Sequence, residues 1–61
     1  EGAAIMSDAE LAKLCLADPG QLTAGRARIL REAASRRNGR ELLRISGVDL
    51  DELDDLLRSA A

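Results

Sequence analysis

Residues 18–37 read DPGQLTAGRARILREAASRR and hold the longest helical pattern of the chain. Two residues can cap the start of this helix: Asp18, which precedes a proline suited to the first turn, and Thr23. The helix should end at Asn38-Gly39, because glycine readily adopts the left-handed conformation that stops a helix. We therefore expect a central helix that starts between Asp18 and Thr23 and ends at this asparagine-glycine pair.

One side of the central helix is expected to face the core. Successive residues of a helix are about 100° apart, so positions three or four apart share a stripe. This stripe contains Leu22, Gly25, Ile29 and Ala33, with Leu30 at its edge. The arginines that fall away from the stripe are Arg28, Arg31 and Arg36.

Arg26 is different, because it lies between Leu22 and Ile29 on the side expected to be buried. Two interpretations remain open. Its aliphatic stem can lie on the core while the charge reaches solvent. Alternatively, its guanidinium is held for a carboxylate of this chain or of a partner.

Three shorter helices are expected around the central one. Ser7 and Glu10 form a capping box that starts the first helix, which should stop before Pro19. Asn38 can cap a third helix that ends at Gly47. The residues expected at the start of the last helix are Asp49 as cap and Glu52 at its third position.

The composition favours helix over sheet. The 61 residues are rich in leucine and alanine, contain no aromatic residue, and include few β-branched residues. Short connections imply adjacent helices that pack antiparallel or crossed. We predict an all-α fold, a compact bundle of four short helices with no sheet, with residues 1–6 as a flexible lead-in and 7–61 as a single helical domain.

The first helix carries apolar residues on two sides. Leu11, Leu14 and Cys15 make one face, whereas Leu16 lies on another side. Such a helix is either sandwiched inside the fold or exposes a strip for another chain, with Leu16 as an apolar anchor. A core without aromatic rings often gains stability from a second subunit, so a homodimer and a compact monomer are both open.

Catalysis, cofactors and metals find no support in the sequence. There is one cysteine and no histidine, so Cys15 has no imidazole to activate it and is interpreted as a small core residue. No apolar run approaches the length of a membrane span. We expect a cytoplasmic protein of bacterial type that is not an enzyme, holds no cofactor or metal and does not associate with membranes.

Charge is segregated along the chain. Residues 1–25 carry four acids and one lysine, residues 26–44 seven arginines and two glutamates, and residues 45–61 five acids and one arginine. In the last helix the leucines form one stripe and the opposite side carries Asp51, Asp54 and Asp55. Opposed charges of this kind select and steer protein partners.

The leading prediction is therefore a non-catalytic docking or adaptor module that binds another protein. The residues predicted to make its contacts are Asp51, Asp54 and Asp55 on an acidic face, Arg28, Arg31 and Arg36 on a basic face, Leu16 as anchor, and Arg26. In its short length, helices, charge segregation and arginine-, alanine- and leucine-rich composition the chain is similar to terminal docking domains of modular polyketide and nonribosomal peptide synthases. An antitoxin-like or adaptor fragment that folds fully only with its partner is a further possibility.

The alternative is a helix-turn-helix-like DNA-binding domain. The segment 39–57, GRELLRISGVDLDELDDLL, has a glycine-bearing turn between two expected helices. Its second helix would present Asp51, Asp54 and Asp55 to phosphates, which repel carboxylates. Nucleic acid would then have to bind through the central arginines, and we regard it as the less favoured partner.

Overall fold

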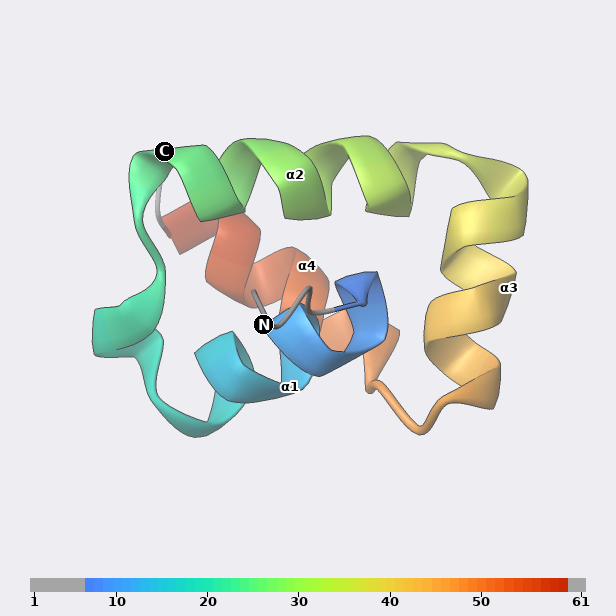
Figure 1. The fold of residues 1–61 in the computed structure, drawn as a ribbon, viewed down its shortest axis with the longest axis horizontal. Coiled ribbons are helices and arrows are strands. Elements are labelled where there is room, and N and C mark those ends of the chain that lie inside the picture. The colour runs from blue at the N-terminus through green and yellow to red at the C-terminus, as the bar shows by residue number, and fades with distance from the viewer. Residues whose placement is uncertain (1–6, 60–61) are drawn as a thin grey trace, which may run out of the picture.

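The computed structural model describes residues 7–59, which contain four α-helices, one 3-10 turn and no strand (Figure 1). The elements are α1 (Asp8–Ala17), η1 (Pro19–Gln21), α2 (Ala24–Ser35), α3 (Arg37–Ile45) and α4 (Leu50–Ser59). The predicted all-α bundle of four short helices is confirmed for this part of the chain. The predicted lead-in, residues 1–6, lies outside the described residues.

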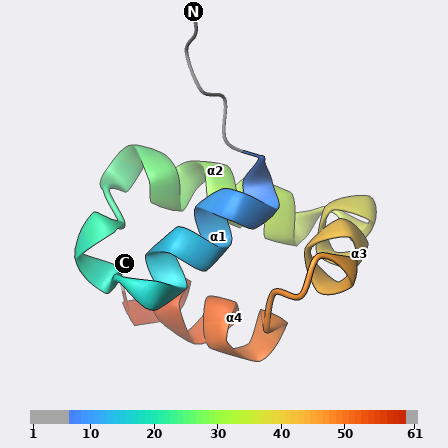
Figure 2. The same cartoon turned by 60° about the horizontal axis from the view of Figure 1, so that its bottom comes forward.

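Helix α1 lies in the middle of the bundle and packs against η1, α2, α3 and α4 (Figure 2). Its start is the predicted capping box: the Glu10 amide donates to Ser7 Oγ at 3.2 Å, and the Ser7 amide donates to Glu10 Oε1 at 3.1 Å. Leu11, Ala12 and Cys15 are all buried. Of the two interpretations of α1, the structure therefore supports the helix sandwiched inside the fold.

The two candidate caps of the central helix each start a different element. Asp18 accepts a hydrogen bond from the Gly20 amide and caps η1, whereas Thr23 Oγ1 accepts from the Arg26 amide at 3.2 Å and caps α2. The chain thus turns once between the two caps, and α2 begins at Ala24.

The predicted end of the central helix is wrong. Helix α2 stops at Ser35, Arg36 is extended, and α3 already begins at Arg37, so the asparagine-glycine pair lies inside α3. The absence of a side chain at Gly39 allows α3 to approach the end of α2 closely; Gly39 does not form a left-handed turn. A Cβ built on Gly39 would lie 2.1 Å from the Ala33 carbonyl oxygen, so a side chain there would collide with the end of α2.

The predicted core face of the central helix is also wrong in large part. The residues of α2 that are buried are Ala27, Leu30, Ala33 and Ala34, whereas Ile29 is 47% exposed and Gly25 is exposed. Helix α2 packs against α1, α3 and α4. The small alanine side chains of α2 let these helices approach closely, and Leu30 fills the space at the centre. The face of α2 that points to the core is therefore rotated away from Ile29.

The junction of α3 and α4 matches the sequence. Gly47 has φ of 95°, and the amides of Gly47 and Val48 donate to the carbonyls of Arg44 and Leu43, which is a Schellman end. Asp49 Oδ1 then accepts from the amides of Asp51 and Glu52 at the start of α4. The leucine stripe of α4 is confirmed, because its inward residues are Leu53 and Leu57, buried, with Leu50 and Leu56 packed against the core. No helix within residues 7–59 combines the length and the apolar character that crossing a membrane requires.

Cys15 provides a probe of the core. Burial raises the pKa of its thiol above the usual value, and the charge of Arg26 lowers it by a smaller amount. Because only the thiolate attacks disulfide reagents, the folded chain at pH 8 should react at least about 100-fold more slowly than the chain in guanidinium chloride. Thiol titration by absorbance measures both rates, and similar rates would contradict the buried position of Cys15. Because the pKa of the thiol is raised by folding, the fold is more stable when the thiol is neutral. This stabilisation is fully present below the pKa of the unfolded thiol and is lost as the pH rises from that value through the pKa of the folded thiol.

Candidate functional site

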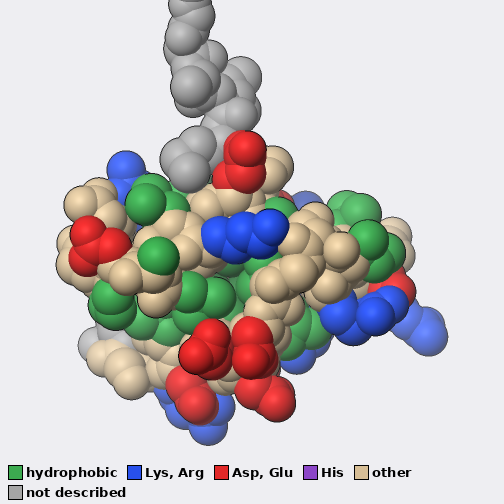
Figure 3. Space-filling model, turned by 90° about the horizontal axis from the view of Figure 1, so that it is seen from below, with side chains coloured by type: hydrophobic (Ala, Val, Ile, Leu, Met, Phe, Trp, Pro, Cys, Tyr) green, Lys and Arg blue, Asp and Glu red, His purple; other side chains and the backbone are tan. Residues whose placement is uncertain are grey.

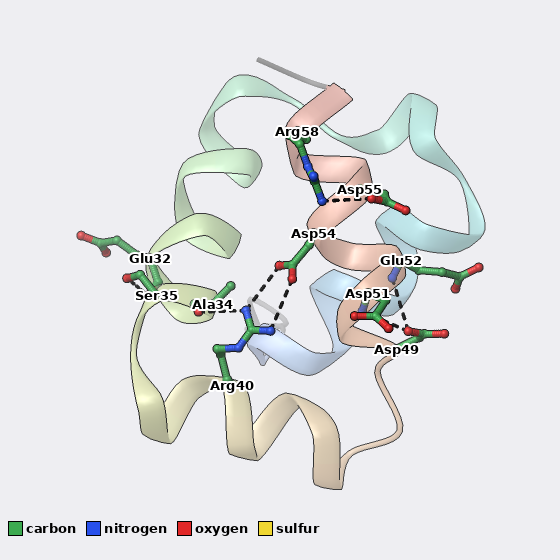
Figure 4. Close-up of polar contacts among 10 residues, drawn as sticks. All are labelled: Glu32, Ala34, Ser35, Arg40, Asp49, Asp51, Glu52, Asp54, Asp55 and Arg58. Atoms are coloured by element: carbon green, nitrogen blue, oxygen red, sulfur yellow. Dashed lines mark hydrogen bonds and ion pairs between the residues drawn. The ribbon is translucent and has the colours of Figure 1, made fainter.

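An open groove runs between α2, the first turns of α3 and α4. The residues that line it are Arg31, Ala34, Ser35, Arg40, Asp54, Leu57 and Arg58. Figure 4 shows that Arg40 on α3 and Asp54 on α4 point toward each other at one side of this groove, with Arg58 further along α4. Three helices thus bring guanidinium groups to one surface.

Arg40 and Asp54 form the least exposed ion pair of the described residues. The two guanidinium Nη atoms lie 3.3 Å from the two carboxylate oxygens, and Nη1 also donates to the Ala34 carbonyl at 3.3 Å. The Arg40 and Asp54 side chains are 39% and 36% exposed, respectively. The pair ties α3 to α4 and to the last turn of α2. The sequence had placed Asp54 on a solvated acidic face, whereas in the structure it is partly covered by this contact.

Arg31 is held by a backbone contact. Its Nη2 donates to the Leu57 carbonyl at 2.9 Å, across from α2 to α4. Carbonyls in the last turn of a helix lack partners within the helix, and a cation there is favourable. Arg31 thus joins two helices and also lines the groove.

The other two arginines predicted for the basic face, Arg28 and Arg36, are not among the residues that line the groove. Arg28 lines a shallow hollow beside the groove together with Arg31 and Glu32. Arg36 lies 3.9 Å from Glu32 in a pair that is more than two-thirds exposed, and pairs of this kind contribute little to stability. We call the surface formed by Arg31, Arg40, Asp54, Leu57 and Arg58 the basic groove.

The Arg26 side chain makes a contact that neither of the two interpretations included. Its Nη1 donates to the Gln21 carbonyl at 2.7 Å and to Gln21 Oε1 at 3.3 Å. The guanidinium therefore closes the connection from η1 to α2 instead of pairing with a carboxylate. Arg26 is not among the residues that line the groove.

The acidic side chains of α4 divide into two groups. Helix α2 lies at the top of Figure 1, and Figure 3 views the molecule from below. Acidic side chains gather over α4 on this lower face. Asp51 and Asp55 are exposed, and Asp55 accepts a hydrogen bond from Arg58 at 3.0 Å. Asp54 therefore differs from Asp51 and Asp55, with which it was predicted to form one acidic face, because it is paired with Arg40 at the groove.

The predicted apolar anchor is mostly used within the fold. Leu16 is partly buried and packs against the core. The large apolar side chains that remain exposed on the described surface are Ile29, Leu42 and Ile45. Leu42 and Ile45 both lie on α3, in which Leu43 is the buried residue.

Residues 7–59 contain no group of three or more histidine, cysteine, aspartate or glutamate side chains arranged to hold a metal ion. No family model, curated protein or solved structure matches this chain.

Proposed function

We propose that this chain is a non-catalytic protein-interaction module whose basic groove docks an acidic segment of another protein. One observation supports this proposal above the others. Arg31, Arg40 and Arg58 come from three different helices and line one open groove, in which Asp54 is the sole acid among the lining residues within 7–59. A short peptide carrying carboxylates is the chemical complement of such a surface.

The groove is prepared for binding by contacts inside the bundle. Arg31 is fixed by the Leu57 carbonyl, and Arg40 is fixed by the Ala34 carbonyl and by Asp54. Side chains that are already ordered lose less conformational freedom when a partner arrives. Arg58 differs, because its pair with Asp55 is about three-quarters exposed and can exchange for a partner carboxylate at little cost.

The acidic surface of α4 supports a role in choosing partners. Asp51, Glu52 and Asp55 are exposed on the same helix that supplies Arg58 to the groove. A partner with the wrong charge pattern would meet repulsion at one surface or the other, which favours selection among related partners. Terminal docking domains of modular synthases are one setting for such a module. The same acids disfavour the DNA alternative, because α4 would present carboxylates to phosphates.

Charge reversal in the groove tests the proposal. We expect a fluorescent polyglutamate peptide to bind the wild-type chain at low salt, and the variant with both Arg31→Glu and Arg58→Glu to bind at least about tenfold more weakly. Fluorescence anisotropy measures the affinity, and circular dichroism verifies the helical fold of the variant. The matched control is Arg37→Glu with Arg44→Glu on α3, which changes the net charge equally and should alter binding by less than about threefold.

The outcomes separate the candidate functions. Equal losses in the groove variant and the control would mean that the peptide responds to net charge alone, and the basic groove would not be a docking site. A wild-type chain that ignores the peptide but binds a short DNA duplex, with binding lost in the groove variant, would replace the proposal by the nucleic-acid alternative.

A further inference from the structure

One of the three arginines of the basic groove already holds a carboxylate. The two Nη atoms of Arg40 lie 3.3 Å from the two oxygens of Asp54, and Nη1 also donates to the Ala34 carbonyl (Figure 4). Two parallel N–H groups of a guanidinium bind the two oxygens of a carboxylate in this way. At Arg40 this position is therefore occupied by an acid of the same chain.

The other two arginines of the groove are more available to a partner. Among the described residues no carboxylate pairs with Arg31, whose Nη2 donates to the Leu57 carbonyl. Arg58 pairs with Asp55, and both side chains are about three-quarters exposed. A partner carboxylate thus meets an uncompensated charge at Arg31, a loosely paired one at Arg58 and a balanced one at Arg40.

The contact between Arg40 and Asp54 can be exchanged for another. Bonds from a guanidinium to a carboxylate are commonly about 2.7–2.9 Å long, and both contacts here are longer, at 3.3 Å. The side chains are 39% and 36% exposed, so solvent screens the pair and its stabilising effect is small. A carboxylate from another molecule can therefore replace Asp54 at Arg40 without uncovering a buried charge.

From these contacts we infer that Asp54 determines the specificity of the basic groove by competing with partner carboxylates for Arg40. The inference rests on the docking function proposed above for the same groove. In place, Asp54 repels a run of acids, and once displaced it leaves an unpaired negative charge beside them. A base next to the partner's acid removes both costs, because the base pairs with Asp54 while the acid pairs with Arg40. Asp54 thus disfavours uninterrupted runs of acid and tolerates segments in which a lysine or arginine stands beside an acid.

Replacing Asp54 with asparagine tests the inference, because the side chain keeps its size and loses its charge. At low salt, Asp54→Asn should bind the fluorescent polyglutamate peptide at least about fivefold more tightly than the wild type does, as measured by fluorescence anisotropy. A peptide of the same length in which lysine alternates with glutamate should gain less than about twofold. Its lysine loses the pair with Asp54 as its glutamate gains access to Arg40.

The matched control is Asp51→Asn. It makes the same chemical change at an exposed aspartate of α4 that does not line the groove. Its affinity for polyglutamate should differ from that of the wild type by less than about twofold. Circular dichroism verifies the helical fold of both variants. Damage to the fold would weaken binding, so a gain in affinity reports on the groove itself.

A measurement on the wild type decides the question if Asp54→Asn does not fold. The carboxyl ¹³C chemical shift of Asp54 should move as polyglutamate saturates the chain, because the carboxylate leaves Arg40. The carboxyl shift of Asp51 should move less. An Asp54 resonance that stays in place at saturation would overturn the inference.

The other outcomes separate the inference from the docking proposal. Equal gains for Asp54→Asn and Asp51→Asn, equal gains for the two peptides, or weaker binding by a folded Asp54→Asn would each overturn the role of Asp54 while docking at the groove stands. If the wild type ignores polyglutamate and Asp54→Asn binds it, Asp54 closes the groove, and the docking function of the wild-type chain is wrong. If neither binds, the docking function and the inference fall together.

Discussion

Replacing Gly39 with alanine should destabilise the fold by about 2 kcal/mol, although alanine is the better helix former by about 1 kcal/mol. The new methyl group would lie 2.1 Å from the Ala33 carbonyl oxygen, which belongs to the backbone and cannot rotate away. Helix α3 would have to move from the end of α2. For a domain of this size the loss corresponds to a fall in Tm of about 8–16 °C, which circular dichroism at 222 nm would measure.

Gly25 provides the matched control for this prediction. It lies in the first turn of α2, and a Cβ built there meets no described atom within 4 Å. Gly25→Ala should therefore stabilise the chain by a few tenths to about 1 kcal/mol. Opposite signs for the same substitution at two helical glycines would support the close approach of α2 and α3. A stabilising effect at Gly39 would contradict that approach.

The second large effect is expected at Leu30. This side chain is fully buried at the centre of α2, and truncation of a buried leucine to alanine costs about 2–5 kcal/mol. A chain of this length has a total stability of only about 3–9 kcal/mol. Leu30→Ala should therefore populate the unfolded state measurably, as urea denaturation monitored by circular dichroism would show.

The neighbouring residue Ile29 distinguishes the observed packing from the packing expected from helical periodicity alone. Because Ile29 is 47% exposed, Ile29→Ala should cost less than about 1 kcal/mol. The stripe expected from the sequence placed Ile29 inside and Leu30 at the edge, which predicts the reverse order. If Ile29→Ala proved the more damaging of the two, the orientation of α2 described above would be wrong.

The boundaries that depend on local chemistry could be predicted from the sequence. The Ser7–Glu10 capping box, the Asp49 cap and the Gly47 stop each involve hydrogen bonds between residues at most five positions apart. A pattern of residue types at fixed spacing therefore contains the necessary information. The leucine stripe of α4 was predictable for the same reason, because its apolar and acidic sides are cleanly divided.

The features that depend on tertiary contact could not be predicted. Gly39 resembled a helix stop, and its packing role depends on the position of Ala33 in another helix. The inward face of α2 is made largely of alanine, which a hydrophobic pattern weights less than Ile29. In both cases close approach between helices outweighs the local preference.

The candidate site shows the same division. Periodicity correctly placed Arg28 and Arg31 away from the core of α2, but it gave no sign that Arg31 reaches the Leu57 carbonyl, 26 residues further along the chain. Arg40 was not singled out at all, although it forms the clamp with Asp54. A charged residue in a basic segment carries no local signal of which carboxylate it will face, so the groove emerges only when three helices are packed together.

Docking of acidic protein segments at the basic groove is tested most directly by amide chemical shifts during titration with a polyglutamate peptide. We expect the largest shifts in a ¹H–¹⁵N correlation spectrum at Arg31, Ser35, Arg40 and Arg58, with smaller changes at the start of α4. Addition of salt should reverse them. Shifts that follow only the exposure of each amide, or that concentrate on α3 around Leu42 and Ile45, would contradict docking at the basic groove.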